Sequence, residues 1–134
     1  MSNDFEFAPA SARLQKAGFR GAPMIKQSDS LGADLAAAIA KVADPTLVVL
    51  FGSRARGQAN DRSDIDLLVI QDPEKRRAST RRAEIGRIRR ALPRVGCPVD
   101  LLLFTPQEVE HWRSARNHVI AEALERGVVI YERP

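Results

Sequence analysis

Two short apolar runs joined by a link of turn residues constrain the fold of this chain more than any other feature. The runs cover residues 46–51 and 65–70, and their β-branched and aliphatic side chains are typical of buried strands. The link, residues 52–64, has about a dozen residues and many turn signals, which is marginal for a parallel crossover. We therefore expect an antiparallel pair, with the end of the first strand beside the start of the second.

The rest of the chain shows the periodicities of three helices and two further strands. Asp44-Pro45 ends the first helix, which follows Ser30 as a candidate N-cap. Thr105-Pro106-Gln107-Glu108 is a capping box with Pro at the first helical position, and Gly127 is a C-terminal stop. The expected helices span residues 31–43, 74–92 and 106–126, and the expected strands span residues 98–104 and 128–131.

This order of elements brings acidic residues together at one end of the sheet. The helix at residues 74–92 is long enough for a right-handed parallel crossover, so the third strand should start where the second one starts. Asp64 and Asp66 are two residues apart on a strand and therefore share a face. Asp100 interrupts the buried run VDLLLF, which is hard to explain unless Asp100 belongs to the same site.

Three neighbouring carboxylates repel one another unless a cation lies among them. Hard oxygen ligands in an incomplete cage suit Mg²⁺, which keeps some water ligands and also binds phosphate oxygens. Two such ions, roughly 3.5–4 Å apart, can stabilise the attacking and leaving oxygens of a phosphoryl or nucleotidyl transfer. Asp64, Asp66 and Asp100 are thus candidate metal ligands and catalytic residues. A calcium loop is disfavoured because the EF-hand spacing is absent.

The turn that precedes these carboxylates has the residue types of a phosphate site. Gly52 allows the backbone to approach a phosphate closely, and Ser53 adds a hydroxyl and an N–H donor. Arg54 and Arg56 offer guanidinium groups for the outer phosphates. Gly52-Ser53 alone would fit an ordinary turn, and the two arginines could be solvated turn residues. Together with the carboxylates, the four residues indicate nucleotide binding.

At this point the residues resemble a known family. Gly52-Ser53, ten residues and then Asp64-Ile65-Asp66 resemble the GS-x10-DxD signature of the DNA polymerase β-type nucleotidyltransferase superfamily. The stretches FGSRARG, SDIDLLV, VDLLLF and EALERGVVIYE are similar to the minimal nucleotidyltransferases of bacteria and archaea. The resemblance covers residues 31–132, nearly all of the expected folded part.

The resemblance implies an α/β (α+β) domain with a small mixed sheet flanked by helices. It implies two Mg²⁺ ions, for which Mn²⁺ can substitute, at Asp64, Asp66 and Asp100. It also implies transfer of a nucleoside monophosphate, AMP where ATP is the substrate, onto a hydroxyl acceptor, with Asp100 activating that hydroxyl. Minimal members commonly act as antitoxins beside a HEPN-domain partner, and some adenylylate it. The absence of an acceptor-binding domain disfavours antibiotic modification and tRNA tailing.

The positive charge of the chain is concentrated in one segment. Residues 74–94 carry nine Lys or Arg against two Glu, a local charge of +7, whereas the whole chain has +4 and the remainder therefore has −3. This segment could be a solvated face, or it could contact an acidic protein or RNA. Aromatic residues make up only 5% of the chain, so RNA binding through residues 76–94 is not favoured.

Two other readings of the function stay open. One is a non-catalytic, nucleotide-sensing module that neutralises a partner by capping it, and the other is an RNA-binding accessory protein. The three neighbouring carboxylates argue against a protein that only binds a partner, since such a protein has no reason to keep three side chains that repel one another. His111 and His118 lie seven residues apart on the expected last helix, where they are read as surface or packing residues because no further zinc ligands are nearby.

Length and composition set the remaining expectations. The 134 residues suffice for one domain, which we expect at residues 29–134 after a flexible extension at residues 1–28. The single cysteine, Cys97, forms no internal disulfide, which fits a reducing compartment. No apolar run approaches the roughly 20 residues of a membrane span. The N-terminus MSNDFEFAPASARLQ does not read as a secretory signal. These features predict a cytoplasmic protein that contacts no membrane, with homo-oligomers left open.

Overall fold

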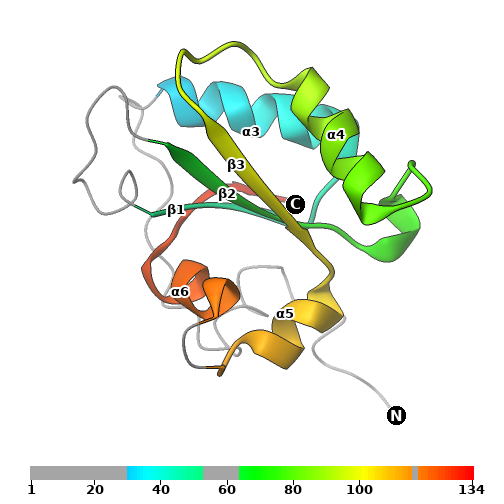
Figure 1. Cartoon of the computed structure of the whole chain (residues 1–134), viewed down its shortest axis with the longest axis vertical. Coiled ribbons are helices and arrows are strands. Elements are labelled where there is room, and N and C mark those ends of the chain that lie inside the picture. Colours follow the sequence, from blue (N-terminus) through cyan, green and yellow to red (C-terminus); the bar gives the residue numbers. More distant parts are fainter. Residues whose placement is uncertain (1–29, 53–63, 116–117) are drawn as a thin grey trace.

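The computed structural model describes residues 30–52, 64–115 and 118–134, and the centre of this part is a mixed sheet (Figure 1). The four strands are β1 (Leu47–Phe51), β2 (Ile65–Ile70), β3 (Val99–Phe104) and β4 (Val128–Glu132). Their order across the sheet is β3-β2-β1-β4. The predicted extension at residues 1–28 and the turn at residues 53–63 lie outside the described residues, so the predicted domain boundary stays a prediction.

The strand pairing has the two orientations that the link lengths predicted. β1 and β2 pair antiparallel with Phe51 opposite Asp66, and β2 and β3 pair parallel with Asp66 opposite Asp100. β4 pairs antiparallel with β1 on the other side, with an irregularity between Val48 and Val49. The predicted α/β (α+β) class with a small mixed sheet is therefore confirmed.

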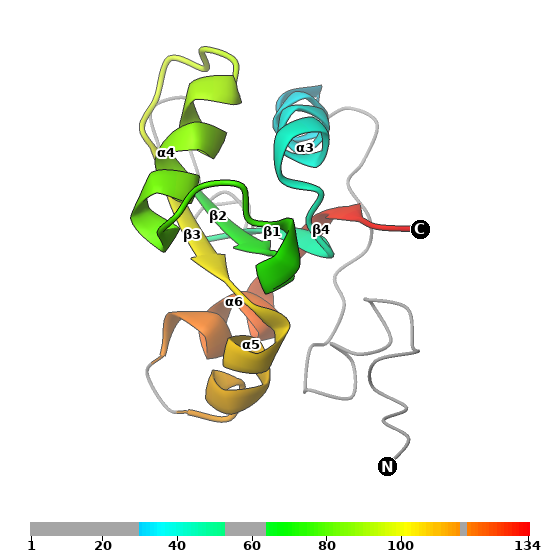
Figure 2. The same cartoon turned by 90° about the vertical axis from the view of Figure 1, so that its right-hand side faces the viewer.

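In the described part of the chain, two helices cover each face of the sheet (Figure 2). α3 (Ser30–Ala43) and α4 (Arg81–Ala91) lie on one face, and α5 (Pro106–Trp112) and α6 (Val119–Arg126) lie on the other. Because side chains alternate along a strand, β2 contributes to two separate cores. The core under α3 and α4 contains Ile65, Leu67 and Val69, whereas the core under α5 and α6 contains Leu68 and Ile70.

The helix expected at residues 74–92 is wrong in its first half. A short 3-10 helix (Pro73–Lys75) follows β2, and α4 begins only at Arg81. Thr80 is the N-cap, and its hydroxyl accepts a hydrogen bond from the backbone N–H of Ala83 at 3.1 Å. Upstream of this cap, the carboxylate of Glu84 accepts backbone N–H groups that a longer helix would have directed elsewhere. The cap and the carboxylate together hold the segment before Thr80 out of helical conformation.

The single helix expected at residues 106–126 is also wrong, because the structure has two. The capping box at Thr105 and Glu108 is confirmed, but α5 ends at Trp112. α6 begins after His118, whose Nδ1 accepts the backbone N–H of Ile120 at 3.1 Å as an N-cap. His118 also stacks on Trp112, with ring centroids 4.4 Å apart and planes within 7°. His111 and His118 therefore lie on different elements, and the local cap and stack explain the break.

The end of α6 follows the sequence prediction. Gly127 is the C-cap, and its backbone N–H donates to the carbonyl of Ala123 at 2.8 Å. A Cβ at this position would lie 2.3 Å from Val49 Cγ1, so the turn into β4 has room only for glycine. Cys97, the single cysteine of the sequence, forms no disulfide within the chain, as expected. None of the helices in the described part of the chain is long and apolar enough to cross a membrane.

Candidate active site

The candidate carboxylates lie at the end of the sheet where β2 and β3 begin. Asp66 is the second residue of β2, Asp100 is the second residue of β3, and the two are direct partners in the parallel register. Asp64 is exposed and immediately precedes β2. Asp66 and Asp100 alternate in phase with residues of the core under α5 and α6, so they occupy that face of the sheet. The fold thus brings together the carboxylates of two strands that are far apart in sequence.

Gly52 lies directly against this cluster. It follows β1, whose last residue Phe51 pairs with Asp66, and its backbone has a φ of +79°. A Cβ added to Gly52 would be 2.2 Å from Asp66 Oδ2. Both the left-handed backbone and this close approach require glycine here. Any side chain at position 52 would push the carboxylate of Asp66 out of its place.

The surroundings of Asp66 favour its neutral form. Burial is the largest cause that raises the pKa of its carboxyl, followed by the negative charges of Asp100, Asp64 and Glu122 and by a hydrogen bond with Asp100. Among the residues that the structure describes, no positive charge is one of these causes. The site therefore gains free energy from a bound proton or from a bound cation.

Sequence reasoning missed Glu122 as a member of this neighbourhood. It lies on α6 and adds a third negative charge that acts on Asp66, after those of Asp100 and Asp64. The sequence carried no signal for it, because its proximity depends on how α6 returns to β4 beside β1.

The donor set fits a hard divalent cation that the substrate helps to hold. All three candidate ligands are carboxylates, the ligand type that Mg²⁺ and Mn²⁺ accept. Within the described ranges, no group of three or more His, Cys, Asp and Glu side chains is arranged to hold a metal ion. Mg²⁺ is commonly bound through one or two carboxylates and completed by water and substrate phosphates. The residues present fit that mode better than a closed protein cage.

Three predicted nucleotide-binding residues cannot be placed. Ser53, Arg54 and Arg56 lie outside the described residues, so their contacts with phosphates stay predictions. Gly52 is the member of the predicted turn that the structure describes, and it lies beside the carboxylates as expected.

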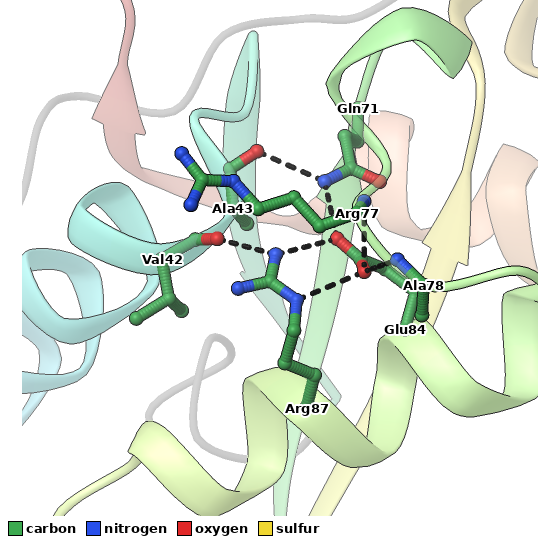
Figure 3. A network of polar contacts seen from close by, with 7 residues as sticks. All are labelled: Val42, Ala43, Gln71, Arg77, Ala78, Glu84 and Arg87. Atoms are coloured by element: carbon green, nitrogen blue, oxygen red, sulfur yellow. Dashed lines mark hydrogen bonds and ion pairs between the residues drawn. The ribbon is translucent and has the colours of Figure 1, made fainter.

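A second polar cluster, at the other end of β2, was not predicted (Figure 3). Its centre is Glu84, a fully buried carboxylate. Glu84 accepts hydrogen bonds from Gln71 Nε2 at 2.8 Å and from the backbone N–H groups of Arg77 and Ala78 at 3.2 and 3.0 Å. Arg87 completes the cluster through Nε at 3.0 Å and Nη2 at 2.7 Å. The sequence hid Glu84, because a lone Glu in an arginine-rich helix has the pattern of a surface charge.

The cluster ties three elements together. Gln71, just after β2, also donates to the carbonyl of Ala43 at 2.9 Å, and Arg87 on α4 donates to the carbonyl of Val42. Burial raises the pKa of Glu84, but the hydrogen bonds from Arg87, Gln71 and Ala78 and the charge of Arg87 outweigh it and lower this pKa to about 2. Glu84 therefore stabilises the start of the crossover that leads from β2 through α4 to β3.

Comparison with known proteins agrees with this geometry. A family model described as "Polymerase beta, Nucleotidyltransferase" matches residues 34–134. The crystal structure of a candidate nucleotidyltransferase from Sulfolobus solfataricus is similar, with a TM-score of 0.53, 18% sequence identity, and coverage of 94% of this chain and 90% of that chain. That similarity supports the fold alone, and the comparison with curated proteins found no match. Since the family model spans most of the chain, including the sheet and the carboxylates, this protein belongs to the polymerase β-type nucleotidyltransferase family.

Proposed function

We propose that this protein is an Mg²⁺-dependent nucleotidyltransferase that moves a nucleoside monophosphate, AMP from ATP, onto a hydroxyl group with release of pyrophosphate. One observation carries the proposal: Asp66 and Asp100 are register partners on parallel strands, and the backbone of Gly52 is packed against Asp66. Among the described residues, this arrangement leaves the negative charge uncompensated beside a glycine whose backbone can approach a phosphate closely. Family membership supports the transferase class.

The residues of the site would divide the work. Asp64, Asp66 and Asp100 would hold Mg²⁺, or Mn²⁺ in its place, and the bound ion would neutralise charge on the triphosphate. Asp100 is exposed on the outer strand β3, where an acceptor can reach it, and its carboxylate would take the proton of the attacking hydroxyl. Gly52 would admit the phosphates to the backbone.

The rest of the phosphate-binding turn would come from the segment between β1 and β2. Ser53 would contribute donors to the phosphates, and Arg54 and Arg56 would bind the outer phosphate oxygens. All three belong to the segment that follows Gly52 in the sequence, which lies outside the described residues.

We further propose that the acceptor is a protein, a HEPN-domain partner that this chain neutralises as an antitoxin. The support is the likeness to minimal nucleotidyltransferases, together with the small size of the domain. The described helices all pack on the single sheet. The described part of the chain therefore leaves no separate module to bind a small acceptor.

The test is transfer of label from α-³²P-ATP to a purified HEPN-domain partner in the presence of Mg²⁺. Wild-type protein should label the partner, and Asp66→Asn should not, while both should bind the partner equally. Glu74→Gln is the matched control, because Glu74 is exposed and follows the opposite end of β2. If wild type and Asp66→Asn neutralise the partner equally and neither transfers label, the protein acts by capping and the catalytic proposal is wrong.

A further inference from the structure

The helix α4 carries a stripe of arginines on the side that faces away from the sheet. Its buried residues, Glu84 and Ile88, face inward. At 3.6 residues per turn, Arg82, Arg89 and Arg90 lie on the opposite side, and all three are exposed. From the first to the last of them the stripe is about 12 Å long, at 1.5 Å per residue.

The arginines of this stripe differ from their neighbours on the same helix. Arg87 is committed to Glu84 and Val42, and Arg81 pairs with Glu108 while lying 5.4 Å over the ring of Phe104. In the part of the chain that the structure describes, no hydrogen bond or ion pair engages the guanidinium groups of the stripe arginines Arg82, Arg89 and Arg90. The fold thus uses two arginines of α4 internally and leaves three for an external partner.

The surface around the stripe suits phosphate better than protein. Protein interfaces are built on an apolar core with aromatic or aliphatic anchors. Ala83 is the only exposed apolar residue of α4, and Trp112, the one large hydrophobic residue exposed in the described ranges, lies on α5 on the other face of the sheet. Guanidinium groups pair with phosphate oxygens through two parallel hydrogen bonds. No Asn, Gln, Ser or Thr lies on α4, so this helix has no neutral polar side chain to read a base.

The direction of α4 connects the stripe to the candidate active site. α4 returns from the end of β2 to the loop before β3, so its C-terminal end lies toward the start of β3 (Figure 1). Arg94, which is exposed, lies in that loop six residues before Asp100. The positive charges therefore continue from α4 toward the end of the sheet that carries the carboxylates.

We propose that Arg82, Arg89, Arg90 and Arg94 bind the phosphate backbone of a nucleic-acid strand without reading its sequence. Among the described residues, the three arginines of α4 have no internal partner and lie on one face, and Arg94 extends them toward the site. This surface is distinct from the acceptor and nucleotide of the proposed transferase reaction. Its binding requires neither NTP nor metal, so it can be tested whether or not the protein is a transferase.

Fluorescence anisotropy with a labelled oligouridine, in buffer without nucleotide or divalent metal, measures this binding. Dissociation constants should lie between about 10⁻⁶ and 10⁻⁴ M, the range of non-specific binding. With four phosphate contacts on a single strand, log K should fall with log salt with a slope of about −3. The double variant Arg82→Gln with Arg89→Gln should lower the slope by about 1.4 and weaken binding about twentyfold near 0.1 M salt.

Arg126→Glu is the matched control, because it removes the same net charge from an exposed position on α6. It should leave affinity and slope close to wild type. An equal loss in both variants would show that only overall charge matters and would overturn the proposal. Unchanged slope in the double variant would overturn it too. Tighter binding of polyglutamate than of oligouridine or of an oligothymidine probe would identify an acidic protein surface as the partner instead.

Discussion

The strand β2 separates two carboxylates that have opposite surroundings. Glu84, bound to Gln71 just beyond the end of the strand, is fully buried and is met by donors from a helix, a loop and a side-chain amide. Asp66, at the start of the strand, is only partly buried but has carboxylates as neighbours. Burial opposes the ionised form of both groups, yet the pKa of Glu84 falls to about 2 and the pKa of Asp66 rises.

The comparison shows that a carboxylate's partners, more than its burial, decide its role. The charge of Glu84 is fully compensated within the chain, so it stabilises the fold and has no capacity left for a ligand. The charge of Asp66 is not compensated by the residues that act on it, so it favours a ligand that supplies positive charge. A fold that carries such an uncompensated cluster keeps it at a cost in stability, which is typical of functional sites.

The largest expected difference between Asp66 and Glu84 is in catalysis. Asp66→Asn should reduce turnover by a hundredfold or more, about 3 kcal/mol of transition-state stabilisation, because the side chain loses the charge that would hold the metal. Glu84→Gln should leave kcat within about twofold below its unfolding temperature, since Glu84 contacts no reacting group. Steady-state kinetics of both variants at the same fraction folded separates the two roles. Equal losses of kcat in both variants would show that Asp66 also acts only through the fold.

The second expected difference is in stability, to which Glu84 contributes through its buried hydrogen bonds. Glu84→Gln should cost about 2 kcal/mol, less than the roughly 3–5 kcal/mol for breaking a fully buried pair because Arg87 is partly exposed, and should lower Tm by about 8 °C. Because the folded pKa of Glu84 is below its ordinary value of 4.5, its contribution is present above that value and is lost as the pH falls toward about 2. Thermal melts across this window should therefore show the difference between wild type and Glu84→Gln shrinking with acid. A difference that stays constant would mean that the carboxylate is not the source of the stability.

The two ends of β2 could not be predicted equally well from the sequence, because one carries local sequence patterns and the other depends on contacts made in the folded chain. The strands at Asp66 and Asp100 were predicted because their apolar runs and link lengths are local, and the glycine and aspartates stand out against them. Glu84 was not predicted, because its partner Gln71 and the backbone N–H groups of Arg77 and Ala78 are brought to it only by the folded crossover. The helix break at Thr80 was missed for the same reason. The apolar periodicity continues through it, but the carboxylate of Glu84 accepts the backbone N–H groups of Arg77 and Ala78.

The other corrected region shows the same limit. The periodicity of α5 and α6 continues through the break between them, and the N-cap at His118 uses a ring nitrogen, a weaker sequence signal than Ser, Thr, Asp or Asn. The stack of His118 on Trp112 depends on where the two helices lie. Short-range rules thus predict elements and their ends where the partner is local, and miss those whose partner comes from another element.

The smallest expected effect is the change in the free energy of unfolding caused by Asp66→Asn. Because its folded pKa is raised above the ordinary value of 3.8, the proton stabilises the folded state, and this contribution is lost as the pH rises through the folded pKa. At neutral pH the ionised Asp66 therefore destabilises the metal-free protein, and Asp66→Asn should raise its free energy of unfolding by about 0.5 kcal/mol. Millimolar Mg²⁺ with ATP should reverse the order, since a ligand that binds only the folded wild type raises its Tm by mass action. Calorimetry of both proteins with and without Mg²⁺-ATP, with Glu74→Gln as control, measures this reversal in the order of their stabilities. If Asp66→Asn is less stable than wild type in metal-free buffer, Asp66 has a structural partner like that of Glu84 and the contrast between the two ends of β2 is wrong.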